Sequence, residues 1–148
     1  MELKVTLTPA SRRTLAKLHT DFKDGFVKGL RKAMLYAESQ AKKSFGNEGN
    51  LKVKTGHLRR SIKSGVRVIA NNAIGFLSAD TIYAAIHEFG GDIYPRVAQY
   101  LRFQLPGGKW VTTDHVYIPE RPYLGPAIED NINKIEDIIK DTIFDRMK

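Results

Sequence analysis

Apolar residues recur at steps of three and four along two long stretches of the chain, which is the spacing of an amphipathic helix. The first stretch follows Thr8 and Pro9, a typical helix start, and predicts one long helix, or two helices with a break near residues 21–25. Its apolar positions are Leu15, Leu18, Phe22, Phe26, Leu30, Met34, Ala37 and Ala41. The second stretch follows Pro119 and Pro122 and predicts a C-terminal helix. Its apolar positions are Ile128, Ile132, Ile135, Ile139 and Ile143.

Shorter segments alternate apolar and polar residues, as half-buried strands do. Residues 2–8 have this pattern and predict a strand. Alternating residues on both sides of Asn71 and Asn72 predict a β-hairpin, because asparagine tolerates the backbone of a tight turn. The alternating residues 101–105 lead into a Pro-Gly-Gly turn and a return strand from Trp110, which predicts a second hairpin. Val116 and Ile118 extend its sheet.

Two short helices and one loop are predicted between these elements. Thr55 caps the first helix, and Asp80 caps the second, which covers residues 81–89 and ends at Gly90 and Gly91. The polar residues 46–54 predict a mobile loop. The fold class is therefore α+β, with an antiparallel sheet of hairpins packed against a long N-terminal helix and a C-terminal helix. With 148 residues, we expect a single domain spanning 1–148.

Composition narrows the function classes. The chain has no cysteine, which excludes disulfides, thiolate catalysis and cysteine-ligated metals. It has no apolar run of the length that a secretion signal or a membrane helix needs, so we expect a soluble protein that does not bind membranes. The formal net charge of +8 is divided unequally: residues 1–75 carry 16 basic and 5 acidic side chains, and residues 76–148 carry 8 and 11.

This charge asymmetry has three interpretations. The basic half could face a nucleic acid or another anion, or basic and acidic poles could meet between subunits in head-to-tail assembly. The charged faces could also simply be solvated. The basic cluster of Arg59, Arg60, Lys63 and Arg67 is the candidate for nucleic-acid contact. Because no aromatic stacking platform accompanies it, this cluster supports only sequence-independent contact with the backbone.

Enzyme signals are weak. His87 and Glu88 resemble the start of a metalloprotease motif, but position 91 is glycine where the second histidine would stand. A metal-assisted hydrolase remains an alternative if folding gathers a site, whose candidate residues are His57, His87, Glu88, Asp114 and His115. Neither a serine elbow nor a glycine-rich phosphate loop is present. We therefore expect no catalysis and no cofactor.

Three segments carry more specific information than these statistics. They are residues 55–62 (TGHLRRSI), 83–91 (YAAIHEFGG) and 118–127 (IPERPYLGPA). In this order and spacing they resemble the tailed-bacteriophage virion morphogenesis family, which overlaps in character with tail-completion and tail-to-head joining proteins. Tyr123 stands where phenylalanine is more usual in that family, and residues 92–116 match no firm family pattern.

The resemblance implies a structural phage protein of the tail end or head–tail junction. Such a protein would act in virion assembly by forming a homo-oligomeric ring, a hexamer by resemblance, and docking to tail or connector proteins. It would be made in the bacterial host cytoplasm and reside in the virion. The basic residues leave open whether they make non-specific contact with DNA or contact another subunit. The motif residues would serve as fold determinants or as interface residues; they are Thr55, Gly56, Leu58, Arg59, Ser61, Tyr83, His87, Glu88, Phe89, Gly90, Gly91, Pro119, Arg121, Pro122, Tyr123 and Leu124. The alternative function is that of a small basic nucleic-acid-binding protein.

Overall fold

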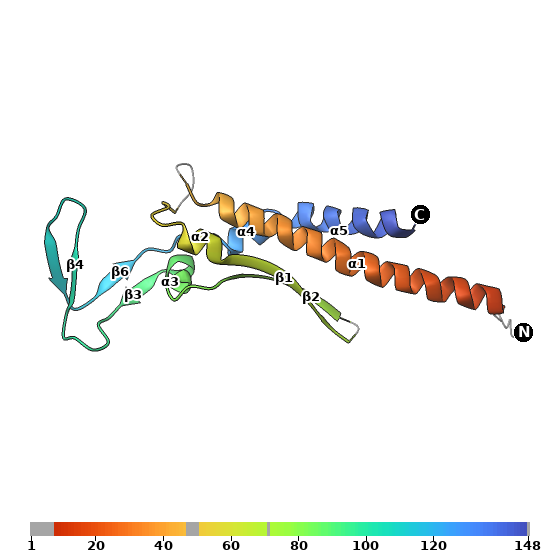
Figure 1. The fold of residues 1–148 in the computed structure, drawn as a ribbon, viewed down its shortest axis with the longest axis horizontal. Coiled ribbons are helices and arrows are strands. Elements are labelled where there is room, and N and C mark those ends of the chain that lie inside the picture. The colour runs from red at the N-terminus through yellow and green to blue at the C-terminus, as the bar shows by residue number, and fades with distance from the viewer. Residues whose placement is uncertain (1–7, 47–50, 71, 148) are drawn as a thin grey trace, which may run out of the picture.

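The molecule is elongated, with helices side by side in one half and a β-arm projecting from the other (Figure 1). The computed structural model describes residues 8–46, 51–70 and 72–147. The helices are α1 (Pro9–Lys43), α2 (His57–Ser61), α3 (Ala84–Phe89), α4 (Gly125–Glu129) and α5 (Ile132–Met147). The strands are β1 (Ile62–Ile69), β2 (Asn72–Ala79), β3 (Gly91–Ile93), β4 (Leu101–Gln104), β5 (Trp110–Thr113) and β6 (Val116–Ile118). The α+β class is confirmed.

Helix α1 is a single helix of 35 residues without a break near residues 21–25. Thr8 caps it, because the Thr8 hydroxyl accepts a hydrogen bond from the Ser11 N–H at 3.2 Å. Gly25 and Gly29 face α5, and a Cβ atom added at Gly29 would lie 3.0 Å from the Ile139 backbone. These glycines therefore let the two helices approach closely.

The core lies where α1, α5, α4 and the β1–β2 hairpin meet. One buried cluster joins α1 to α5 through residues that include Ala33, Ala37 and Ile135. A second cluster surrounds the C-terminal end of α1 and contains Ala41, Phe45, Leu51, Leu58, Ile62, Ala84, Tyr123 and Ala127. The N-terminal part of α1 extends past this core, so its apolar side chains Leu15, Leu18 and Phe22 are exposed (Figure 1).

The first predicted hairpin is present as β1 and β2, which pair antiparallel from Ile62 opposite Ala79 to Ile69 opposite Asn72. Gly75 faces α1, where a side chain would collide with Met34. The positive φ of the turn falls on Ala70 (51°), and Asn72 already belongs to β2, so the predicted turn position is wrong. Asn71 lies outside the described residues.

The strands form three separate two-stranded ladders. The second predicted hairpin is β4 paired with β5, and Val116–Ile118 does not extend it as expected. This segment pairs instead with Gly91–Ile93, a strand that the alternation did not predict. The β3–β6 and β4–β5 ladders build the arm, residues 91–118, which leads away from the helices (Figure 1).

Several predicted boundaries are wrong. Gly56, with φ of 69°, occupies the cap position of α2 in place of Thr55. Helix α3 begins at Ala84 without a side-chain cap, so Asp80 does not cap it. The C-terminal helix is divided at residues 130–131, where the Asn131 amide donates to the Ala127 carbonyl and accepts from the Tyr36 hydroxyl.

Two predicted segments lie partly or wholly outside the described residues. The predicted strand 2–8 falls almost entirely on residues 1–7, and the centre of the predicted loop 46–54 is residues 47–50. The described ends of that loop are tied together, since the Gly46 N–H donates to the Leu51 carbonyl at 3.0 Å. Leu51 is buried in the core. Within the described part of the chain, none of the helices combines the length and the apolar character that crossing a bilayer requires.

Candidate functional site

A buried carboxylate joins two of the three sequence motifs. Glu88, on α3, is 8% exposed, and its oxygens accept hydrogen bonds from three consecutive backbone N–H groups. The donors are Tyr123 at 2.9 Å, Leu124 at 3.0 Å and Gly125 at 2.8 Å. These N–H groups open helix α4, where unpaired donors and the helix dipole favour a negative charge. Glu88 therefore links residues 83–91 to residues 118–127.

Two further contacts close this motif junction, which comprises residues 83–91 and 118–127. The Arg121 N–H donates to the His87 carbonyl at 2.8 Å. Gly90 has φ of 67°, and a Cβ atom there would lie 2.7 Å from the Glu120 backbone nitrogen. Glycine is therefore required at position 90 both by its backbone angle and by the close approach of the second motif.

Tyr123 is fully buried beneath the junction, and its ring meets the Phe45 ring edge to face at 5.2 Å between centroids. Its hydroxyl is buried and has no hydrogen-bond partner among the described residues. Burial and the nearby Glu88 carboxylate raise the pKa of Tyr123 to about 12. Among the described residues, the hydroxyl thus makes no hydrogen bond that a phenylalanine at this position would lack.

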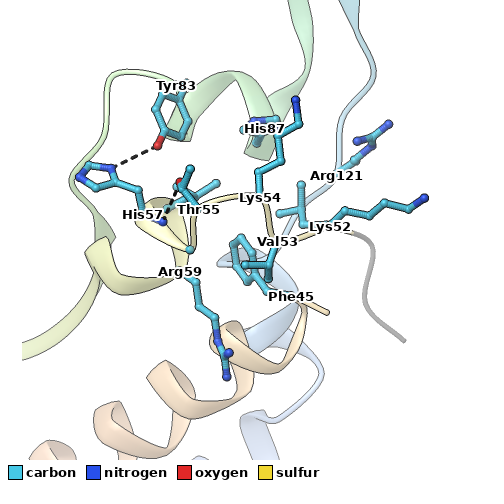
Figure 2. A pocket seen from close by; sticks show the side chains of 13 residues that line it. Phe45, Lys52, Val53, Lys54, Thr55, His57, Arg59, Tyr83, His87 and Arg121 are labelled. Carbon is cyan, nitrogen blue, oxygen red and sulfur yellow. Dashed lines mark hydrogen bonds between the residues drawn. The ribbon is translucent and has the colours of Figure 1, made fainter. Parts of the chain in front are cut away.

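Beside the junction lies a basic pocket of about 720 Å³, lined by Phe45, Leu51, Lys52, Val53, Lys54, Thr55, Gly56, His57, Leu58, Arg59, Tyr83, His87 and Arg121 (Figure 2). Six of these side chains are basic residue types, and none is acidic. Its basic and apolar lining residues suit a ligand that carries both an anionic group and a hydrophobic part.

Two histidines of the basic pocket have different environments. The His57 Nδ1 atom and the Tyr83 hydroxyl are hydrogen-bonded at 3.2 Å (Figure 2). His87 is half-buried, and its Nδ1 atom is buried without a partner among the described residues. Burial, together with the positive charge of Arg121, lowers the pKa of His87. His87 therefore resists protonation.

The residues of the predicted nucleic-acid cluster line different hollows. Arg59 lines the basic pocket, whereas Arg60 and Lys63 line a separate small hollow that also contains Asp80. Arg67 is further along β1, opposite Ile74 of β2. The structure thus distributes these four cations over three places.

The candidate metal site is not assembled. Across residues 8–46, 51–70 and 72–147, no three histidine, aspartate or glutamate side chains gather in a way that could hold a metal ion. His115 lies in the arm, hydrogen-bonded to Asp114 at 3.0 Å, and Glu88 is occupied by the backbone of α4. The metal-assisted hydrolase hypothesis therefore has no assembled metal site among the described residues.

Comparison with protein-family models matches residues 32–143 to the phage virion morphogenesis family. The chain belongs to the phage virion morphogenesis family. The match includes the basic pocket, the motif junction, the arm and most of α5. Searches of curated proteins and of solved structures gave no match.

Membership of this family gives the chain a structural role in the assembly of a phage particle, and makes it a particle-associated protein that interacts with other virion proteins. The motif residues divide by burial. Leu58, Glu88 and Tyr123 are buried and serve the interior. The exposed ones, which are available to partners, are Thr55, Arg59, Tyr83, Phe89, Pro119 and Arg121. The others are half-buried: Gly56, Ser61, His87, Gly90, Gly91, Pro122 and Leu124.

Sequence reasoning missed two parts of the site. Lys52 and Lys54 line the basic pocket, although their segment was predicted to be a mobile loop. Their alternation with Leu51 and Val53 was a usable signal, since it indicates an extended segment with one apolar side. The bonds of Glu88 to residues 123–125 had no local signal, because these residues are far apart in the sequence.

Proposed function

We propose that this protein completes the end of a phage tail or joins the tail to the head, without catalysis, by forming a homo-oligomeric ring that docks on neighbouring virion proteins. The family match supports the structural role. The observation that carries the finer proposal is the large apolar surface that one copy leaves uncovered. That surface would be covered by further copies and by the adjoining ring.

The surface area makes this argument quantitative. The chain exposes 11432 Å², whereas a compact monomer of its mass would expose about 7600 Å². Large apolar side chains are exposed at both ends of the molecule, among them Phe22 on α1 and Trp110 in the arm. Because monomeric proteins rarely leave such surface exposed, it favours an assembled state.

Charge also favours contacts between copies. The outer positions of α1 are rich in lysine and arginine, whereas exposed Asp137 and Asp141 lie on α5. Basic and acidic surfaces on the same chain attract each other between copies, and the attraction is screened by salt. A ring of six copies is the expected size, and it would lie at the tail end or the head–tail junction.

Disruption of the gene in its phage, followed by negative-stain electron microscopy of the lysate, tests the proposal. We expect filled heads separated from tails, or tails of abnormal ending. Complementation with the wild-type gene is the control. Normal infectious particles would refute the proposed role.

Native mass spectrometry of the purified protein tests the charge contribution. We expect a ring whose population falls as salt is raised, and a weaker ring for Asp137→Lys with Asp141→Lys. The matched control is Glu120→Lys, a charge reversal at an exposed residue outside the arm and α5. A ring that is insensitive to both salt and the α5 reversal would remove the electrostatic part of the proposal.

Contact with DNA is the second candidate, favoured by the basic pocket, which has no acidic residue in its lining. Binding of a DNA duplex would then weaken steeply with salt, in proportion to the phosphates contacted. Arg59→Ala and Lys54→Ala should each reduce that salt dependence. Absence of binding at low salt would dismiss this candidate.

A further inference from the structure

The arm exposes an unusual concentration of aromatic side chains. Tyr94, Tyr100, Trp110 and Tyr117 are each more than half exposed, and Val97, at the far part of the arm, is 101% exposed. Residues 92–117 carry three basic and two acidic side chains, so the arm is nearly neutral. An aromatic, nearly neutral projection is better suited to an apolar groove than to a nucleic-acid backbone.

An open apolar groove lies at the opposite end of the molecule. It separates α1 from the far end of the β1–β2 hairpin and has a volume of about 630 Å³. Its lining is mostly apolar surface from Phe22, Phe26, Val27, Val68 and Ala73, and its polar residues are His19, Lys23, Asp24 and Asn72. Phe22 and Val68 are about half exposed. This volume falls within the range of roughly 300–1000 Å³ that is typical of sites that bury a ligand.

The chain cannot fill this groove with its own arm. The arm leaves the body beyond α3, whereas the groove lies toward the free N-terminal part of α1, so the length of the body separates them (Figure 1). A second copy can place its arm there without this restriction. Two different surfaces at opposite ends of one chain make a heterologous contact, which closes into a ring or continues as a filament.

The available area is sufficient for such a contact. The chain exposes about 3800 Å² more than a compact monomer of the same mass. A standard interface covers about 800 Å² per partner, and each copy in a ring would need two of them. The surplus therefore exceeds the area that two such interfaces would cover.

We propose that the arm of one copy, residues 91–118, inserts its aromatic side chains into the groove between α1 and the β1–β2 hairpin of the next copy. This inference rests on the proposed self-assembly and specifies which surfaces make it. The partner is thus a second copy of this chain.

Cross-linking tests the pairing directly, because the chain has no cysteine of its own. Val97→Cys in the arm and Val68→Cys at the groove are combined in one chain and treated with a short bis-maleimide. We expect a ladder of linked copies at a protein concentration of about 1 mM, at which even a millimolar Kd populates the complex. The matched control combines Val97→Cys with Lys134→Cys, an exposed position on α5. An equal ladder from the control would overturn the proposal.

Mixing two blocked variants distinguishes this contact from any symmetric one. Trp110→Asp with Tyr100→Asp blocks the arm, and Phe22→Asp blocks the groove. We expect each variant to lose self-association at least about tenfold, as loss of central aromatic contacts does. An equimolar mixture should form a dimer and nothing larger, since it contains one intact arm and one intact groove per pair. The mass is read by native mass spectrometry, after thermal melting has verified that each variant is folded.

The remaining outcomes separate the two proposals. A wild-type assembly that survives in both variants would overturn the arm-in-groove contact and leave self-assembly standing. A wild-type chain that stays monomeric at about 1 mM, together with a Val97→Cys, Val68→Cys chain that stays unlinked, would overturn both the contact and self-assembly. Cross-links from Val97→Cys to a different virion protein in assembled particles, without links between copies, would also overturn the contact.

Discussion

The motif junction and the arm are neighbours in sequence and differ in nearly every physical respect. The junction, residues 83–91 and 118–127, buries a carboxylate with three backbone donors and packs Tyr123 in the core. The arm lies between these two segments and exposes most of its large side chains. The junction therefore clamps the base of the arm, and the arm leaves the body from a fixed origin.

The junction and the arm also differ in how their sequences can be interpreted. The motif residues are dense in the junction, where their hydrogen bonds are internal. The arm contains none of the three motifs, although it exposes several aromatic side chains. A motif can thus identify the family through residues that build the frame, while the surface that we propose for contact between copies is formed by residues outside the motifs.

The largest expected effect comes from adding a single methyl group at the junction. Gly90→Ala should lower the free energy of unfolding by about 3 kcal/mol, because it combines a positive φ with a collision against the Glu120 backbone. Gly107→Ala is the matched control, since Gly107 also has positive φ but has no atom within 4 Å of an added Cβ. We expect a loss of about 1 kcal/mol for the control. Equal losses in urea denaturation would show that the close approach is unimportant.

The second largest effect concerns the carboxylate itself. Glu88→Gln should cost about 2 kcal/mol, because the amide NH₂ group cannot accept a hydrogen bond and would oppose a backbone N–H. Glu120→Gln makes the same chemical change at an exposed neighbour and should be nearly neutral. Chemical denaturation measures both. A loss no greater for Glu88→Gln than for Glu120→Gln would contradict the proposal that Glu88 holds residues 83–91 against residues 118–127.

The elements with periodic patterns were predictable from the sequence. Helix α1 and the β1–β2 hairpin follow from their apolar spacing, although Ile74 and Phe76, which indicated β2, lie on its exposed face. Strand β3 was missed because it has three residues, Gly91–Ile93, which are too few for alternation to show. The C-terminal helix was predicted as one because its isoleucine spacing continues through Asn131, whose side-chain hydrogen bonds accompany the break.

The site was predictable only in part, for a related reason. Sequence spacing identified His87, Glu88 and Arg121 as significant but could not show that Glu88 bonds to residues 123–125. That pairing depends on a fold that brings two distant segments together. The apolar groove likewise combines α1 with a hairpin tip, and neither segment signals it alone.

A pH-dependent contribution is expected at the edge of the junction. Burial and Arg121 lower the pKa of His87, so the unfolded chain binds this proton more readily than the folded chain. The contribution of His87 to the free energy of unfolding is fully present above the pKa of histidine in the unfolded chain, about 6.5. It is lost as pH falls below that value. His87→Gln should therefore lose less stability than the wild type between about pH 7.5 and pH 5.5. A difference between the two chains that is constant over this range would contradict the expectation.

A smaller change of opposite sign is expected at Tyr123. Tyr123→Phe removes a buried hydroxyl that has no described partner, so we expect stability to be unchanged or raised by up to about 1 kcal/mol. Tyr36→Phe is the matched control, because the Tyr36 hydroxyl donates to Asn131 at 3.1 Å and its removal should cost stability. Thermal melting compares the two. A clear loss for Tyr123→Phe would show that its hydroxyl has a partner after all.

The smallest effect on folding is expected in the arm, and it completes the comparison. Trp110 is 57% exposed and its main described contact is the Arg102 guanidinium, 5.0 Å from the ring centre. Trp110→Ala should change the free energy of unfolding by no more than about 0.5 kcal/mol, since exposed cation–π contacts contribute little. Its effect should appear instead in the mass of the assembly. A large loss of stability in dilute monomeric protein would show that Trp110 stabilises the fold. The arm and the junction would then not differ in this way.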